Sequence, residues 1–274
     1  MFMAKARNCT SCTRQGEAAA PCGAMLTLLL LFAAGVWAGA QNALAGGGSF
    51  VTLPALILAG LDAKLANIAS TIAMFPGQVV SGVAGRRMIE DVPGLKFRTL
   101  AVISLGGGAA GALLLLYTSS GTFNRLVPWL VLIATGIFAW GNFAPRSKGS
   151  KARIGPVGAA ALQGAVAVYG GYFSGGIGFL MMALLTMSGM AVRAAGAAKN
   201  MLAGIINASA VILFLATTRV PLMEVIVLGS GAVAGGLWGV WLLRRINESW
   251  LKIGILILGL ALFAGLLLRA QNGS

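Results

Sequence analysis

The chain of 274 residues contains no histidine and only six acidic residues. Without histidine, a histidine-based catalytic triad and a haem held by histidine are excluded. The acidic residues lie in tails, in loops or at the ends of apolar segments: Glu17, Asp62, Glu90, Asp91, Glu224 and Glu248. A transmembrane proton relay places such groups inside the helix bundle. No motif supports a serine–lysine hydrolytic pair either, so we expect a protein that is not an enzyme.

Cysteine is scarce, and all three cysteines precede the first long apolar run: Cys9, Cys12 and Cys22. A C-x-x-C spacing suggests metal or redox chemistry. A zinc site needs about four ligands, which this histidine-free chain does not offer, so we expect no metal and no cofactor. Met25 opens directly onto the apolar run. Residues 1–24 are therefore expected to be a disordered tail that need not belong to the native protein.

Charged residues make up only 9% of the chain, whereas apolar residues make up 58%. Soluble domains carry about 25% charged residues, and a helix that crosses a bilayer needs about 20 mainly apolar residues. Five segments meet or approach that length: 99–117, 126–143, 194–216, 223–243 and 250–268. The fold class predicted is all-α, a polytopic transmembrane helix bundle embedded in a lipid bilayer.

The net charge is +14. Membrane proteins collect Lys and Arg in their cytoplasmic loops, so this excess does not indicate a nucleic-acid partner. Arg86, Arg87, Lys96 and Arg98 predict that the loop 86–98 is cytoplasmic, together with the basic linker 144–153.

Glycine is abundant, with 40 residues, and it reveals an internal duplication. At an offset of 129, Gly46 falls on Gly175, Gly60 on Gly189 and Gln78 on Asn207. Each half runs as an apolar segment, a glycine cluster, a short apolar segment, a turn and three spans. We expect about eight hydrophobic units in two transmembrane repeats, 25–143 and 154–269, joined by the linker 144–153 and followed by a C-terminal tail, 270–274.

The sequence allows two relative orientations of the repeats, inverted or parallel. If each glycine-interrupted segment crosses the membrane twice, each repeat has five crossings and the second repeat is inverted. If each segment crosses once, the repeats are parallel. The loop charges do not decide between these alternatives.

The two glycine clusters are the main candidate site. They comprise Gly46, Gly47, Gly48 and Ser49 in the first half and Gly175, Gly176 and Gly178 in the second. A helix that begins after such a cluster presents free N–H groups and a partial positive charge, which suits an anion. Interrupted helices at matched positions of two repeats indicate a transporter site. Alternatively, the glycines only permit close helix crossing.

Lys199 lies within the span 194–216, and its counterpart in the first half is Ser70. A charge at that depth tends to face a cavity or a partner, and no acidic residue lies in a neighbouring span. An anionic substrate would supply the partner. The alternative is that the lysine snorkels to the membrane interface.

Further polar residues lie within apolar spans: Thr71, Gln78, Asn200 and Asn207. They are candidates for substrate binding, and interhelical hydrogen bonds are the alternative.

Two stretches resemble the signatures of the TauE/SafE sulfite-exporter-like family. The first, 39–54, contains Gly-Gly-Gly-Ser-Phe-Val-Thr-Leu-Pro, and the second, 169–207, contains Gly-Gly-Tyr-Phe, Gly175-Gly176 and Ala-Lys-Asn. Ile177 departs from the triple glycine of the first stretch. The resemblance covers residues 25–268 and implies a duplicated permease of the inner membrane that exports small sulfur-containing or organic anions.

The residues allow two other functions, a passive anion channel and a membrane scaffold that transports nothing. An anion that leaves a negative cytoplasm gains about 2.3 kcal/mol per charge for each 100 mV, so export needs no coupling carboxylate. The identity of the anion and the oligomeric state stay open, and a homo-oligomer is compatible with the sequence.

Overall fold

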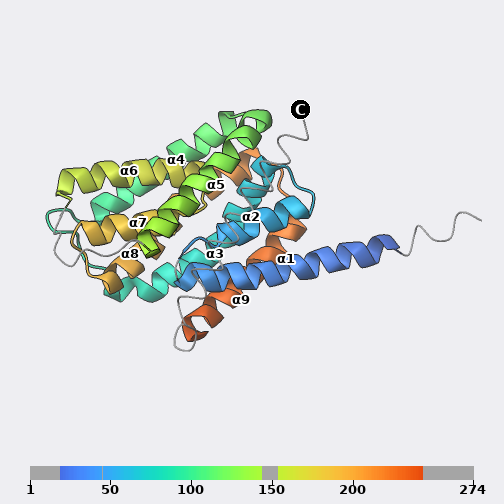
Figure 1. Cartoon of the computed structure of the whole chain (residues 1–274), viewed down its shortest axis with the longest axis horizontal. Helices are drawn as coiled ribbons and strands as arrows, with labels where there is room; N and C mark the ends of the chain where they lie inside the picture. The colour runs from blue at the N-terminus through green and yellow to red at the C-terminus, as the bar shows by residue number, and fades with distance from the viewer. Residues whose placement is uncertain (1–18, 45, 144–153, 243–274) are drawn as a thin grey trace, which may run out of the picture.

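A computed structural model describes residues 19–44, 46–143 and 154–242, and within them the chain is helical (Figure 1). The helices are α1 (Ala19–Leu44), α2 (Ser49–Leu58), α3 (Ala63–Gly85), the 3₁₀ turn η1 (Arg86–Met88), α4 (Phe97–Tyr117), α5 (Ser120–Phe143), α6 (Pro156–Tyr172), α7 (Ile177–Met187), α8 (Val192–Thr217) and α9 (Leu222–Leu242). The first helix thus begins before the predicted start at residue 25. The predicted linker 144–153, the tail 270–274 and the span 250–268 lie outside the described residues.

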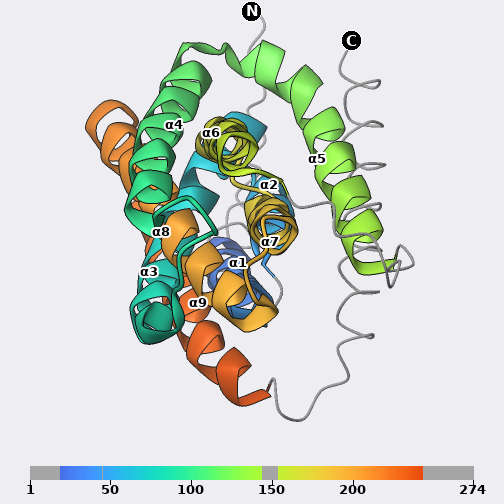
Figure 2. The same ribbon diagram turned by 90° about the vertical axis from the view of Figure 1, so that its left-hand side faces the viewer.

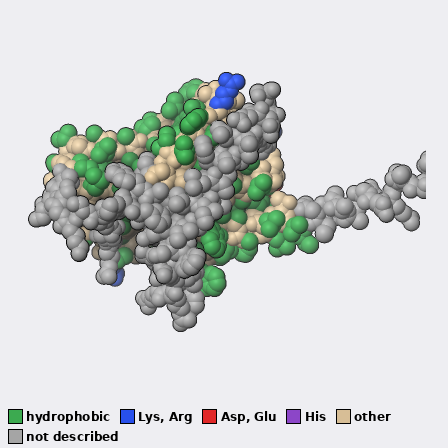
Figure 3. Space-filling view, in the orientation of Figure 1, with side chains coloured by type: hydrophobic (Ala, Val, Ile, Leu, Met, Phe, Trp, Pro, Cys, Tyr) green, Lys and Arg blue, Asp and Glu red, His purple; other side chains and the backbone are tan. Residues whose placement is uncertain are grey.

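Among the described residues, four helical segments are long and apolar enough to cross a bilayer: Met25–Ala43, Ala63–Met88, Phe97–Tyr117 and Ala194–Thr217. Large hydrophobic side chains also lie on the outer surface, where Leu58 is 88% exposed and Val102 is 71% exposed. On the described surface seen in Figure 3, hydrophobic and uncharged atoms predominate and few Lys or Arg side chains are visible. These features confirm the predicted polytopic helical bundle.

The glycine-interrupted segments form two helical hairpins, α1–α2 and α6–α7. In the second hairpin, the amide of Ile154, just before α6, donates a hydrogen bond of 3.2 Å to the carbonyl of Met187 at the end of α7. The hairpin therefore enters and leaves at the same end of the bundle. In Figure 1, α2 likewise runs back along α1.

Both short hairpin helices end in the same way. Gly60 after α2 and Gly189 after α7 have φ angles of 100° and 95°. The next residue of each turn, Leu61 or Met190, donates its amide to a carbonyl five residues earlier. Glycine is favoured at this left-handed position because a β-carbon would be strained there. The sequence match of Gly60 with Gly189 thus corresponds to a shared backbone turn.

Among the described helices, the hairpins lie between a wall formed by α4, α8, α3 and α9 on one side and α5 on the other (Figure 2). The hairpin helix α1 packs along α9 of the wall, α6 packs along α4, and α3 crosses α8 at the centre of the wall. These pairs are equivalent under exchange of the two halves. The first helix of each hairpin, α1 or α6, therefore packs against a helix of the other half.

The two lateral interfaces match glycine by glycine. A β-carbon at Gly39 would collide with the carbonyl of Ala232, and one at Gly171 with the carbonyl of Gly108. The same holds for Gly235 against Val36 and for Gly111 against Val168. Small residues permit such close backbone approach in membranes. The duplication seen in the sequence is therefore also a duplication of helix contacts.

At the central crossing, α3 and α8 are antiparallel. Contacts advance along α3 while they recede along α8: Gln78 with Asn207, Gly82 with Met201 and Gly85 with Ala197. Equivalent antiparallel helices are exchanged by a two-fold axis perpendicular to their length. The second half is therefore inverted relative to the first. The hairpins explain the inversion, because each hairpin returns to the end of the bundle at which it entered, which leaves an odd number of crossings in each half.

Candidate functional site

The first hairpin turns at residues 46–49, which we call the first tip. Gly46 and Gly47 have φ angles of 91° and 79°, and α2 begins at Ser49. The side-chain amide of Gln41 donates to the carbonyl of Gly47 at 3.0 Å. Because Gln41 is fully buried, this bond fixes the turn from inside the protein.

The second hairpin turns at residues 173–178, the second tip. Gly176 has a φ of 78° and precedes α7, which begins at Ile177 rather than after Gly178 as the sequence suggested. The hydroxyl of Tyr169 donates to the carbonyl of Gly175 at 2.9 Å. No side chain caps either short helix at its N-terminus. The amides of both first turns thus begin close to the tips, where a helix carries partial positive charge.

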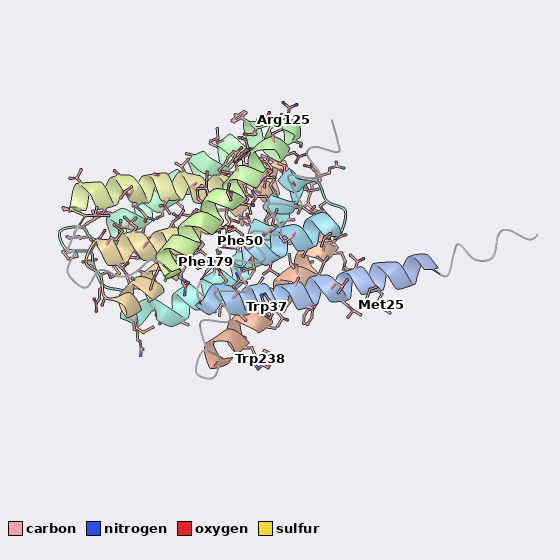
Figure 4. The ribbon with its side chains drawn as sticks, in the orientation of Figure 1. Met25, Trp37, Phe50, Arg125, Phe179 and Trp238 are labelled. Atoms are coloured by element: carbon pink, nitrogen blue, oxygen red, sulfur yellow. The ribbon has the colours of Figure 1, made fainter. Side chains whose placement is uncertain are left out.

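The two tips meet at the centre of the molecule. A β-carbon at Gly46 would lie 3.1 Å from the α-carbon of Gly178, and the reverse distance is the same. A β-carbon at Gly47 would lie 2.5 Å from the ring of Phe179 and 3.1 Å from the ring of Phe50. These two phenylalanines are labelled in Figure 4, where they lie within the bundle. The glycines therefore permit direct contact of two backbones.

Hydroxyl groups bridge the tips. Ser49 Oγ of the first tip lies 3.3 Å from Ser174 Oγ of the second. Thr71 of α3 places its hydroxyl 3.0 Å from Ser174 Oγ and 2.8 Å from the carbonyl of Asn67. The amide of Asn67 in turn donates to the carbonyl of Tyr172 at 3.0 Å. The described polar side chains thus converge from both halves on one buried point.

Lys199 reaches the same point from α8. Its side chain is only 4% exposed. A β-carbon at Gly178 would lie 3.6 Å from Lys199 Cδ and 3.9 Å from Nζ. No hydrogen-bond or ion-pair partner of this ammonium occurs within the described residues. The structure thus excludes the snorkelling alternative, because the side chain stays buried.

The electrostatic environment of the Lys199 ammonium is unfavourable. A cation is stabilised at the C-terminus of a helix and destabilised at its N-terminus, yet this ammonium lies against Gly178 in the first turn of α7. A buried charge without a partner is costly. An anion at the tips would offset both effects.

The counterpart of Lys199 has a different environment. Ser70 on α3 is buried, and its hydroxyl lies 2.5 Å from that of Thr52 on α2. The first half thus satisfies its polar group internally, whereas the second half leaves a cation unpaired within the described residues.

Gln78 and Asn207 lie apart from the tips. Asn207 Nδ2 donates to Gln78 Oε1 at 2.6 Å across the α3–α8 crossing. Gln78 follows Thr71 by about two helical turns, roughly 10 Å along the axis. The side chain of Asn200 makes no hydrogen bond within the described residues, and its backbone lies against Gly82. The predicted set therefore divides into a group at the tips and a pair at the crossing.

The tips are closely packed. Their glycines and Ser49 are buried, and Met74 and Phe173 contact the positions that β-carbons would occupy at Gly48 and Gly175. Two cavities, of about 160 Å³ and 60 Å³, lie along α3, one against α8 and the other against α9. The arrangement described is thus closed at the tips.

Three polar residues of the site escaped the sequence analysis: Gln41, Asn67 and Ser174. Gln41 and Asn67 carry the same signal as Thr71, a polar side chain in an apolar segment, and that signal could have found them. Ser174 lies within the second glycine cluster. Among the described residues, no group of His, Cys, Asp and Glu could hold a metal ion.

Comparison with known proteins gives matches over most of the chain. The family model described as "Sulfite exporter TauE/SafE" matches residues 31–266. The "Probable membrane transporter protein YfcA" of Escherichia coli K12 is 25% identical over 244 residues, which cover 88% of this chain and 90% of the relative. Its counterparts in Escherichia coli O6:H1 and O157:H7 match to the same extent.

Proposed function

The chain belongs to the sulfite exporter TauE/SafE family and is a multi-pass membrane transporter, and from this premise we propose that it is an inner-membrane permease that exports a small anion. Sulfite, a sulfonate or a related organic anion is the substrate class proposed. The observation that carries the proposal is the ammonium of Lys199. It is buried beside Gly178 and has no acidic partner within the described residues.

The anion is held between the tips in this proposal. Backbone amides at the starts of α2 and α7 and the hydroxyls of Ser49, Thr71 and Ser174 donate hydrogen bonds to its oxygens, and Lys199 supplies the opposite charge. Charge-assisted hydrogen bonds of this kind are about twice as strong as neutral ones. The glycines at positions 46, 47, 48, 175, 176 and 178 let the two backbones approach the anion closely.

Transport requires the tips to separate, because they touch one another in the closed arrangement described above. The hairpins open toward opposite ends of the bundle, so movement of one hairpin exposes the tips to one side of the membrane only. Alternating access in inverted repeats follows this scheme. Gln78 and Asn207 join the halves at the α3–α8 crossing, about which such a movement would occur.

Proteoliposomes containing the purified protein provide the test. We expect saturable efflux of sulfite or a sulfonate that grows with an inside-negative potential. Lys199→Met keeps the length of the side chain but removes its charge, and it should lower efflux by about tenfold or more, since a hydrogen bond to a charged group contributes about 1.5–3 kcal/mol. Lys96→Met, at an exposed lysine, is the matched control and should leave efflux unchanged.

Thermal unfolding separates substrate binding from a structural role of the lysine. Without anion, Lys199→Met should be at least as stable as the wild type, because it removes a buried charge. With anion, only the wild type should gain stability. Unchanged efflux in Lys199→Met would refute the role of this residue. Efflux that does not saturate would indicate a channel, and the absence of both flux and anion-dependent stabilisation would indicate a scaffold.

A further inference from the structure

A groove on the outer surface follows the line where α3 and α8 cross. It encloses about 160 Å³ and is lined by Phe75, Gln78, Val79, Val83, Met201, Gly204, Ile205 and Ala208. Val79 and Val83 are 40% and 46% exposed, so the groove opens outward. Its lining contains no charged residue. In a membrane protein, such a surface faces hydrocarbon, and it suits an acyl chain.

Gly204 keeps the groove open. A β-carbon at this position would meet only the backbone of Gln78, at 3.9 Å, which is an ordinary van der Waals distance. Gly204 also lies within α8 and has no positive φ. Neither helix contact nor backbone conformation requires a glycine here, in contrast to Gly39 or Gly235. Its effect is to leave room.

Two arginines lie at the end of the groove that faces the loop 86–96. Arg86 and Arg87 follow α3 directly and are exposed. They come three and four residues after Val83, a spacing that places side chains on the same face of a helical turn. Neither arginine has an ion-pair partner within the described residues. The groove therefore runs from an apolar channel to a pair of free guanidinium groups.

We propose that this groove binds one anionic phospholipid, with an acyl chain between α3 and α8 and the phosphate on Arg86 and Arg87. Guanidinium groups bind phosphate oxygens in pairs of parallel hydrogen bonds. Basic sites between transmembrane helices on the cytoplasmic side are suited to anionic headgroups. Because α3 and α8 belong to different halves, the bound lipid contacts both halves at their crossing.

The test uses the purified full chain in detergent, with phosphatidylglycerol or phosphatidylcholine of the same acyl composition added in steps. Thermal unfolding and native mass spectrometry report stabilisation and bound lipid. We expect phosphatidylglycerol to bind and stabilise the wild type more strongly than phosphatidylcholine does. Removal of each arginine, by Arg86→Gln or Arg87→Gln, should weaken this preference by about fivefold, as expected for about 1 kcal/mol per basic residue.

Two controls separate the parts of the proposal. Lys96→Gln and Arg98→Gln, made singly, each remove one positive charge from the start of α4 and should leave the lipid preference intact. Gly204→Leu fills the groove and should lower the binding of both lipids, whereas Gly204→Ala should change it little. Glycerol phosphate without acyl chains should not stabilise the protein.

Three results would overturn the proposal. They are equal binding of the two lipids by the wild type, an unchanged preference in the arginine variants, and a dimer that dissociates on Gly204→Leu. The last result would show that a second copy of the chain, and not a lipid, covers the groove.

Discussion

The two halves of the molecule agree in how their helices cross and differ in what they bring to the centre. The α1–α9 and α4–α6 interfaces use glycines at equivalent positions against equivalent carbonyls. At the tips, however, the second half supplies Lys199 where the first supplies Ser70. Steric constraints on backbone contact apply to both halves equally, whereas one anion needs only one cation. The comparison thus separates positions that maintain the fold from positions that we assign to the substrate.

A second difference lies within the matched interfaces. In α4–α6, the amide of Gln163 donates to Ser104 Oγ at 2.7 Å, and Gln163 Oε1 is buried with no hydrogen-bond partner in the described part of the chain. Counted back from the matched glycines, Gly39 with Gly171 and Gly235 with Gly111, the equivalent positions in α1–α9 are the buried leucines Leu31 and Leu228. The interface of the second hairpin is therefore more polar at this level than the interface of the first.

The largest expected loss of stability is at the α1–α9 and α4–α6 interfaces. Gly235→Val and Gly111→Val both drive a side chain into a carbonyl of the facing helix, and each should lower the free energy of unfolding by about 3 kcal/mol or more. Folded yield and thermal unfolding in detergent measure this. Gly106, also in α4, has open space around its β-carbon position, and Gly106→Val is the matched control. Similar losses in all three variants would contradict the role of the close contacts.

The next effect is at the point where the tips touch. Gly46→Ala adds a β-carbon at a φ of 91° and 3.1 Å from the α-carbon of Gly178. We expect a loss of about 2 kcal/mol in the closed arrangement, from backbone strain together with the contact. Cysteine accessibility at Ser174→Cys should rise in the same background, because the tips are held apart. No change in accessibility would argue against the contact.

A smaller effect of opposite sign is expected when the second half is made to resemble the first. The double variant Gln163→Leu with Ser104→Leu replaces this hydrogen-bonded pair, in which Gln163 Oε1 is unpaired within the described residues, by the leucines found at the equivalent positions. Stability should rise by about 1 kcal/mol, since a buried polar atom without a partner is costly. Leu31→Gln is the reverse change and should lower stability. Thermal unfolding of these variants checks both signs, and a loss of stability in the double variant would show that the polar pair stabilises the α4–α6 interface.

The smallest effect concerns the bond at the crossing. A double-mutant cycle with Gln78→Ala and Asn207→Ala should give a coupling of about 0.6 kcal/mol, the average for hydrogen bonds between membrane helices. Equilibrium unfolding in mixed micelles supplies the four free energies. Zero coupling would show that the amides contribute separately. Transport should respond less to these changes than to Lys199→Met.

The sequence was sufficient to predict the helical fold, the duplication and the two glycine turns, because hydropathy and glycine spacing are local signals. It could not predict that Gly46 meets Gly178, since contact between residues so far apart depends on how the halves associate. Ser174 was missed for the same reason, because its hydroxyl gains meaning only beside Ser49 and Thr71. The grouping of Gln78 and Asn207 with the tips assumed that symmetry implies one site, whereas the structure separates them along α3 and α8.

The crossed pairing of α1 with α9 and of α6 with α4 has a consequence for biosynthesis. The ribosome releases α1 early, but α9, which covers the glycine-containing face of α1, is complete only after nearly two hundred further residues have been translated. During that interval this face of α1 contacts lipid or chaperones, and contacts between segments distant in the sequence form slowly. A transcript truncated between the halves would yield a first half in which the glycine-containing faces of α1 and α4 are both uncovered. The first and second halves, produced from separate messages, should nevertheless associate in the bilayer, because each contains the helices that cover the exposed faces of the other.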